Sequence, residues 1–252
     1  MKKTEETNHW NPESYNKHTH FVSALAMPVV ALLDPKKGED ILDVGCGEGT
    51  LAVEIAQSGA RVFGVDMSAQ MVAMACKRGV DAYVGSVTTL DDTKKYDKVF
   101  SNATLHWVKE ARVAVQNMAK VLKKEGVFVA EFGAKGNVAH IVNAIETSFA
   151  KHPEFGVFEN PWYFPSVASY EALLVSEGFE VTHIERIVRP TPMDDIGNWV
   201  EVFTQGITQE LNSKQFSIFK QEVVEQLKAT NYTQKEGWMA DYVRLRVKAY
   251  KQ

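Results

Sequence analysis

Short apolar runs alternate with amphipathic stretches along the first 150 residues of the chain. The runs, each rich in apolar residues, lie at 41–44, 61–65, 81–84, 96–100 and 127–132, and apolar residues recur at helical spacing within 51–58, 69–78, 110–122 and 137–149. Strands that alternate with helices are typical of a largely parallel sheet with helices on both faces. The pattern therefore predicts an α/β fold.

The C-terminal third has a different pattern. Residues 179–188 alternate between apolar and polar side chains and predict a sixth strand, which we expect Arg189-Pro190-Thr191-Pro192 to end. Two apolar stripes at helical spacing then predict a helical insertion over 190–240. Residues 242–249 alternate strictly and predict a terminal strand, with one face made of Val243, Leu245, Val247 and Ala249.

One stretch carries the chemistry: residues 40–50 read Asp-Ile-Leu-Asp-Val-Gly-Cys-Gly-Glu-Gly-Thr. An apolar run, three alternate glycines and a helical stretch predict a strand, a tight loop and a helix. Glycines let the backbone bend sharply, so we expect the loop N–H groups to approach a ligand. The dinucleotide fingerprint needs a glycine where Thr50 stands, and the P-loop needs a Gly-Lys-Ser/Thr sequence that is absent. The loop therefore predicts another kind of cofactor site.

The stretch resembles the D-x-G-x-G-x-G loop of class I S-adenosylmethionine-dependent methyltransferases. The next apolar run ends at Asp66, about 20 residues beyond the first glycine, where a carboxylate can accept both ribose hydroxyls. The resemblance implies S-adenosylmethionine as cofactor and a Rossmann-like, mostly parallel seven-stranded sheet with an antiparallel last strand. It implies cofactor contacts from Asp43, Gly45, Cys46, Gly47, Asp66, Met67, Met71, Ser86, Val87, Asn102 and Ala103.

Two of these assignments have alternatives. Asp66 could cap the next helix, but Ser68 can perform that role. Many members of the family carry an acidic residue after the third strand, where this chain has Ser86 and the backbone of Val87. A hydroxyl and main-chain groups can make similar hydrogen bonds to adenine.

Residues 101–107, Ser-Asn-Ala-Thr-Leu-His-Trp, follow the fourth predicted strand. They resemble the S-N-x-x-L-x-W segment of the branch that includes trans-aconitate methyltransferase, and not the Asn-Pro-Pro-aromatic segment of enzymes that methylate bases or glutamine. The resemblance implies a small-molecule acceptor and favours a carboxylate oxygen. His106 is the candidate catalytic residue. It is either a base for an acceptor that loses a proton or an imidazole packed on Trp107.

The acceptor side is expected to combine an N-terminal lid with aromatic side chains. Residues 1–33 are either a solvated amphipathic cover or a helical lid, which this family often has. The aromatic, proline-rich segment 155–165 is either a packed crossover or part of the acceptor pocket. To that pocket we assign Trp10, Tyr15, His18, Trp107, Glu131, Trp162 and Tyr163.

Composition narrows the class of protein further. The 252 residues suit one large domain, 1–252, divided into lid (1–33), core (34–189), insertion (190–240) and terminal strand (241–252). A net charge of −4 with scattered basic residues disfavours nucleic acid as a partner. Two isolated cysteines, no signal peptide and no long apolar run predict a reduced, cytoplasmic protein that does not span a membrane. No metal site is predicted, and monomer and homodimer are equally open.

Other functions stay open. An NAD-dependent oxidoreductase shares the fold and the ribose carboxylate, but Thr50 disfavours it. A non-enzymatic module would keep the cofactor site without an acceptor pocket. If His106 is a base, the acceptor is another small-molecule oxygen or nitrogen.

Overall fold

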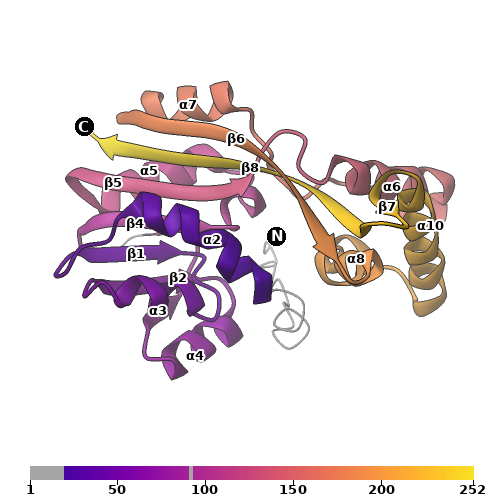
Figure 1. The fold of residues 1–252 in the computed structure, drawn as a ribbon, viewed down its shortest axis with the longest axis horizontal. Coiled ribbons are helices and arrows are strands. Elements are labelled where there is room, and N and C mark those ends of the chain that lie inside the picture. Colours follow the sequence, from indigo (N-terminus) through magenta and orange to yellow (C-terminus); the bar gives the residue numbers. More distant parts are fainter. Residues whose placement is uncertain (1–19, 91–92) are drawn as a thin grey trace, which may run out of the picture.

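The computed structural model describes residues 20–90 and 93–252. Its sheet has the strand order β3-β2-β1-β4-β5-β8-β6 (Figure 1). The first five strands in this order run parallel, and β8 runs antiparallel to both β5 and β6. The predicted α/β sheet with an antiparallel last strand is confirmed. Its strands are β1 (Asp40–Val44), β2 (Arg61–Asp66), β3 (Asp81–Val84), β4 (Tyr96–Asn102), β5 (Leu122–Gly133), β6 (Phe179–Met193) and β8 (Gly237–Lys251); the short β7 (Tyr232–Thr233) pairs with β8.

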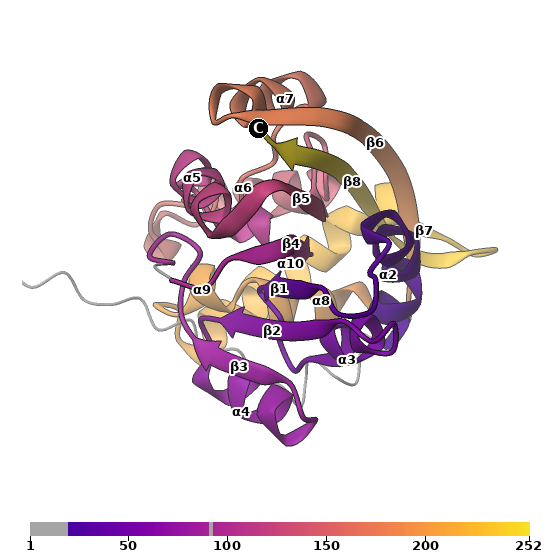
Figure 2. The same cartoon turned by 90° about the vertical axis from the view of Figure 1, so that its left-hand side faces the viewer.

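Helices cover both faces of the sheet (Figure 2). One face carries α2 (His20–Leu33), α3 (Thr50–Ala56) and α4 (Ala69–Lys77), and the other carries α5 (Ala111–Val121) and α7 (Val167–Ser176). From β1 the chain adds β2 and β3 on one side, and then β4 and β5 on the other. In open α/β sheets ligands bind at such a switch point, beyond the carboxyl ends of the strands.

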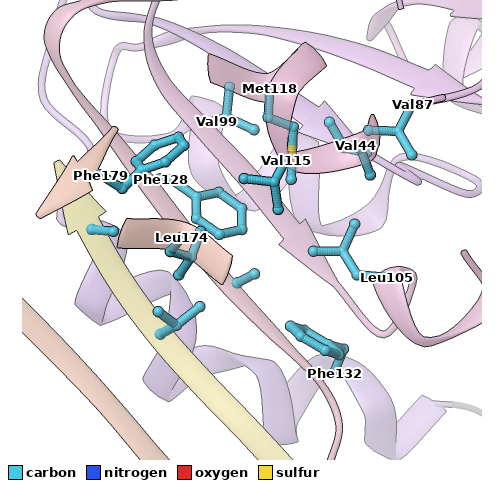
Figure 3. Close-up of a cluster of buried hydrophobic side chains, with 14 of the residues drawn as sticks. Val44, Val87, Val99, Leu105, Val115, Met118, Phe128, Phe132, Leu174 and Phe179 are labelled. Carbon is cyan, nitrogen blue, oxygen red and sulfur yellow. The ribbon is translucent and has the colours of Figure 1, made fainter. Parts of the chain in front are cut away.

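The larger core lies between the sheet and the helices α5 and α7 (Figure 3). Val99 and Phe128, which are neighbours on β4 and β5, pack in one cluster with Val115, Met118 and Leu174. Full burial of one such side chain stabilises a protein by about 1.5–3 kcal/mol. This core therefore holds the strand ends that carry the candidate site.

The strands β6 and β8 continue beyond the rest of the sheet as a two-stranded ribbon (Figure 1). Pairing of β5 with β8 ends at Gly133 and Arg244, whereas β6 pairs with β8 as far as Met193 and Trp238. The prediction that the proline-containing segment 189–192 ends the sixth strand is therefore wrong. Because β6 is an edge strand, proline is tolerated there: its missing N–H need not face a partner.

The ribbon leads to a helical lobe. The lobe combines α6 (Ala139–Lys151) with α8 (Ile196–Phe203), α9 (Gln205–Thr208) and α10 (Ser213–Asn231), which are the predicted insertion before the last strand. It has its own core, in which Ile145, Val200 and Phe219 are buried. The short 3-10 helix η1 (Leu105–Trp107) joins the two cores, because Leu105 packs in the first and Trp107 against the second.

Two lysines hold the end of the N-terminal helix α2. Lys98 Nζ donates to the carbonyl oxygens of Leu33 and Asp34 at 3.1 and 2.7 Å, and Lys248 Nζ donates to that of Leu32 at 3.2 Å. These contacts satisfy carbonyl groups that a helix end leaves without intrahelical partners. The candidate lid residues Trp10, Tyr15 and His18 lie outside the described residues. Within 20–90 and 93–252, no helix is long and apolar enough to cross a membrane.

Candidate active site

The glycine loop after β1 has a left-handed backbone that favours glycine. Gly45 and Gly47 have φ values of 75° and 54°, in the left-handed region. A Cβ on Gly45 would lie 2.1 Å from Thr104 Oγ1, whereas a Cβ on Gly47 would meet no atom within 4 Å. The loop is therefore packed against Thr104 at Gly45 and open at Gly47, where a ligand can approach the backbone.

The loop amides are already bonded within the protein. Gly45 and Cys46 donate to the Val65 carbonyl oxygen at 2.8 and 3.2 Å, and Gly47 donates to Asp66 Oδ2 at 2.9 Å. The expectation that these N–H groups face a ligand is therefore wrong. The carbonyl oxygens of Gly45, Cys46 and Gly47 each accept one hydrogen bond within the protein and keep a second lone pair, which suits a cationic ligand group. The Cys46 side chain packs with Ala52, Ala75 and Val80, and burial raises the pKa of its thiol.

Asp43 lies one residue before the end of β1 and is only 3% exposed. Its carboxylate has no hydrogen-bond partner among the described residues. Burial raises the pKa of Asp43 to about 7, with a further contribution from the nearby Asp66. A buried carboxylate without a protein partner suits a positively charged group, and S-adenosylmethionine has two, an ammonium and a sulfonium. Asp43 and the open loop thus fit this cofactor.

Asp66 ends β2 and ties the neighbouring backbone together. Its Oδ1 accepts from the Ser68 N–H and its Oδ2 from the Gly47 N–H, each at 2.9 Å. Ser68 is the N-cap of α4, as expected, because its Oγ accepts from the Met71 N–H at 3.3 Å. Burial raises the pKa of Asp66, and the two N–H bonds oppose that shift. Each carboxylate oxygen keeps a lone pair for a ribose hydroxyl.

The candidate adenine contacts flank Asp66. Met67 is 61% exposed, so its side chain is accessible to a ligand, whereas Met71 is buried in α4. The Ser86 hydroxyl pairs with Thr88 Oγ1 at 2.8 Å, and the Val87 carbonyl oxygen accepts from Asn117 Nδ2 at 3.0 Å. The Ser86 hydroxyl and the Val87 carbonyl are thus engaged locally, which leaves Met67 as the most accessible of the four.

The end of β4 brings Asn102 and Ala103 to the glycine loop. Ala103 has a φ of 56° and donates its N–H to the Glu131 carbonyl oxygen at 2.8 Å. Thr104 was not among the predicted site residues, yet its Oγ1 donates to the carbonyl oxygens of Asn102 and Gly45 at 3.1 and 3.3 Å. Thr104 lies in the segment 101–107 after the fourth strand, and this position was the signal that could have identified it.

His106 is buried in η1 beside Trp107, with ring centroids 5.5 Å apart. Its Nδ1 accepts from the Gly133 N–H at 3.3 Å. Burial, with a contribution from Arg244, lowers the pKa of His106 well below its usual value. The imidazole is therefore neutral and carries its proton on Nε2, which makes Nε2 a donor. Of the two interpretations left open, this geometry favours the packed imidazole over the base.

The predicted aromatic residues separate into two groups. Trp107 and Trp162 lie 5.7 Å apart between ring centroids, and Phe203 of α8 stacks on Trp107 at 6.5 Å. Tyr163 instead packs against the core of the sheet and donates its N–H to the His106 carbonyl oxygen at 2.8 Å. The helical insertion thus supplies one wall of the aromatic cluster, which the sequence did not specify.

Glu131, which was assigned to the acceptor pocket, is bound by two arginines. It is 3% exposed and binds Arg189 through two hydrogen bonds at 2.6 and 3.1 Å. Arg246 binds the same carboxylate at 2.7 and 2.8 Å and reaches Glu185 at 3.3 Å. Its carboxylate oxygens are therefore committed to the protein.

Sequence reasoning missed the arginines of this face. Arg244 and Arg246 alternate with the apolar residues of the terminal strand, whose apolar face alone was considered. The terminal strand carries three cationic residues at alternate positions, Arg244, Arg246 and Lys248. Cations on a strand inside a sheet need partners, so this alternation was the signal that could have revealed them. Among residues 20–90 and 93–252, no cluster of His, Cys, Asp or Glu could hold a metal ion.

Comparisons with known proteins agree with this geometry. The sequence profile described as a methyltransferase domain matches residues 42–130. An uncharacterized methyltransferase of Schizosaccharomyces pombe is 32% identical over 257 residues, covering 97% of this chain and 98% of the relative. The trans-aconitate 2-methyltransferase of Mycobacterium marinum is 26% identical over 229 residues, or 85% of each chain.

A solved structure shares the fold. The YcgJ protein of Bacillus subtilis superimposes with a TM-score of 0.65 and 16% identity, covering 90% of this chain and 99% of that one. The fission-yeast relative is similar over nearly its whole length, and the loop and Asp66 fit the cofactor. The chain therefore belongs to the class I S-adenosylmethionine-dependent methyltransferases.

Proposed function

We propose that this methyltransferase transfers the methyl group to a carboxylate oxygen of a small organic acid. The observation that carries the proposal is the hydrogen bond from the Gly133 N–H to His106 Nδ1. It occupies the lone pair with which the imidazole would take a proton. A carboxylate acceptor needs no base, because it is already ionised at neutral pH.

Different residues of the site would bind different parts of the cofactor. Asp66 would hold the ribose, Met67 would contact adenine, and Asp43 with the loop carbonyls would hold the cationic methionine part of the cofactor. The bound cofactor supplies an activated methyl group: an oxygen–carbon bond forms while the carbon–sulfur bond breaks and its electron pair stays on sulfur. The chain's own contribution is to orient the acceptor and exclude water.

The similarity to trans-aconitate 2-methyltransferases supports an acid as the acceptor. So does the position of Arg244, which pairs in register with Gly133 at the end of β5. Transfer to a phenol or an amine would need a proton acceptor, and the bonded Nδ1 of His106 disfavours that alternative. Membership of the methyltransferase family removes the NAD-dependent oxidoreductase from the alternatives.

The test follows label from methyl-labelled S-adenosylmethionine into trans-aconitate, into simpler mono- and dicarboxylic acids, and into RNA and protein fractions. We expect label in an acid, released by mild base as a methyl ester is. Label that resists base, or that enters only RNA or protein, would overturn the carboxylate acceptor. Tight cofactor binding with no transfer to any fraction would favour the non-enzymatic module.

A further inference from the structure

Arg244 of β8 lies where the parallel strands end. It pairs in register with Gly133, the last residue of β5, and the Gly133 N–H binds His106. Ligands of open α/β sheets lie beyond these carboxyl ends. Arg244 thus stands at the point where the sheet, η1 and the start of the ribbon meet.

The Arg244 guanidinium lies over an aromatic ring. Its central carbon is 4.3 Å from the centroid of the Tyr242 ring. The ring is fixed in turn, because the Tyr242 hydroxyl accepts from Trp199 Nε1 at 2.7 Å. An aromatic platform holds the planar fork of a guanidinium in place, and such a fork matches a carboxylate with two parallel hydrogen bonds.

Two neighbouring arginines bind a buried carboxylate of the protein. Arg189 and Arg246 share the buried carboxylate of Glu131. Arg244 is the arginine whose charge acts on His106 and lowers the pKa of its imidazole. His106 Nε2 has no partner among the described residues, so a cation and a neutral N–H donor are close together.

We propose that Arg244, with the Nε2–H group of His106, binds an anionic group of the acceptor that is not itself methylated. The oxygen that is methylated has to approach the methyl carbon in line, and a guanidinium bound to it would withdraw its negative charge. Arg244 therefore selects acids with a second anionic group, such as dicarboxylates. The inference rests on the proposed transfer to a carboxylate and adds the residue that chooses among acids.

The experiment compares fumarate, with two carboxylates, and crotonate, with one, in the wild type and in Arg244→Gln and Arg244→Lys. Arg186→Gln is the matched control, because Arg186 is exposed on β6 and pairs with the apolar-face residue Leu245. The readouts are KM and kcat for transfer, and the Kd of each acid for the complex with S-adenosylhomocysteine. We expect Arg244→Gln to raise KM and Kd for fumarate about 10- to 100-fold. Arg244→Lys should raise them less, since it keeps the charge and loses the fork.

Constants for crotonate, affinity for S-adenosylhomocysteine and all constants of the control should stay unchanged. Transfer to fumarate with the same KM in wild type and variants would overturn the role of Arg244 and leave the proposed function standing. Arg244-dependent binding of fumarate without transfer to either acid would overturn the proposed function and support the anion site. Equal losses for both acids would mean a structural role and overturn the inference, as would a wild type that binds neither acid. If Arg244→Gln does not fold, the test uses Arg244→Lys instead. A ratio of fumarate to crotonate KM and Kd equal to that of the wild type would then overturn the inference.

Discussion

The Gly133 N–H donates to His106 Nδ1 across 3.3 Å, so the end of β5 fixes which nitrogen of the imidazole carries the proton. His106→Asn tests this, because the amide oxygen can take over the acceptor position of Nδ1. We expect kcat to stay within about tenfold of the wild type, since loss of a true general base costs about 10²- to 10⁴-fold. The measurement is steady-state transfer to an acid acceptor, with the melting temperature as a check of folding. A folded variant whose kcat falls by more than tenfold would support His106 as the general base.

Gly45 and Gly47 should respond differently to the same substitution. Gly45→Ala places a Cβ 2.1 Å from Thr104 Oγ1 and should destabilise the fold. Gly47→Ala meets no protein atom within 4 Å, so it should mainly weaken cofactor binding. Gly38→Ala is the control, because Gly38 also has a positive φ of 87° with nothing within 4 Å and lies in the turn before β1. Chemical unfolding and calorimetric titration with S-adenosylhomocysteine separate the effects. Equal affinity in the Gly38 and Gly47 variants would contradict the open cradle.

Asp43 should make the stability of the ligand-free protein depend on pH. Its pKa is about 7 in the folded protein, and an unfolded aspartate ionises near pH 4. The folded state therefore binds the extra proton between these values, so stability falls as the pH rises from about 4 to 7 and then levels off. Asp43→Asn should abolish this component.

At pH 8 the Asp43→Asn variant should be more stable than the wild type without cofactor and should bind S-adenosylmethionine more weakly, because the negative charge is gone. Urea unfolding at pH 5 and pH 8, with cofactor titrations at pH 8, measures both effects. Asp81→Asn, on the exposed start of β3, controls for the loss of a surface carboxylate. The assignment fails if the stability difference between Asp43→Asn and the wild type is the same at both pH values.

Asp66→Ala should weaken binding of the cofactor by about 1–3 kcal/mol, the range for leaving polar groups unpaired. It should also lower the melting temperature, because the Gly47 and Ser68 N–H groups lose their acceptor. Asp66→Asn keeps one oxygen and should lie between the wild type and alanine in both measurements. Cofactor affinity that does not change in either variant would remove Asp66 from the ribose role.

Glu131→Gln should destabilise the fold by about 3–5 kcal/mol, because it leaves Arg189 and Arg246 without their shared buried charge. Glu185→Gln is the matched control. It removes a carboxylate that also contacts Arg246 but has a side chain 42% exposed, so its effect should be below about 1 kcal/mol. Urea unfolding measures both. If both variants lost similar amounts of unfolding free energy, the burial of Glu131 would not explain the strength of its ion pairs.

Local pattern in the sequence was sufficient for most elements of the fold. Alternation and helical spacing predicted the strands, the helices and the insertion, because burial on one face imposes these periods on each element separately. The loop, Asp66 and the Ser68 cap were predictable for a similar reason, since the groups that define them are neighbours in the chain or at adjacent strand ends. The edge position of β6 was not predictable in this way, and so the sequence predicts a strand end at its prolines.

Tertiary structure alone decided the acceptor side. Glu131 meets Arg189 and Arg246 across 58 and 115 residues of chain, and His106 meets Gly133 across 27. The Val65 carbonyl and the Asp66 carboxylate, which belong to the next strand, turn the loop amides inward. Such partners depend on strand order and register, which the period of one segment does not encode. The sequence therefore determined the sheet and the cofactor loop, and the packing of distant strands determined which charges and protons face the acceptor.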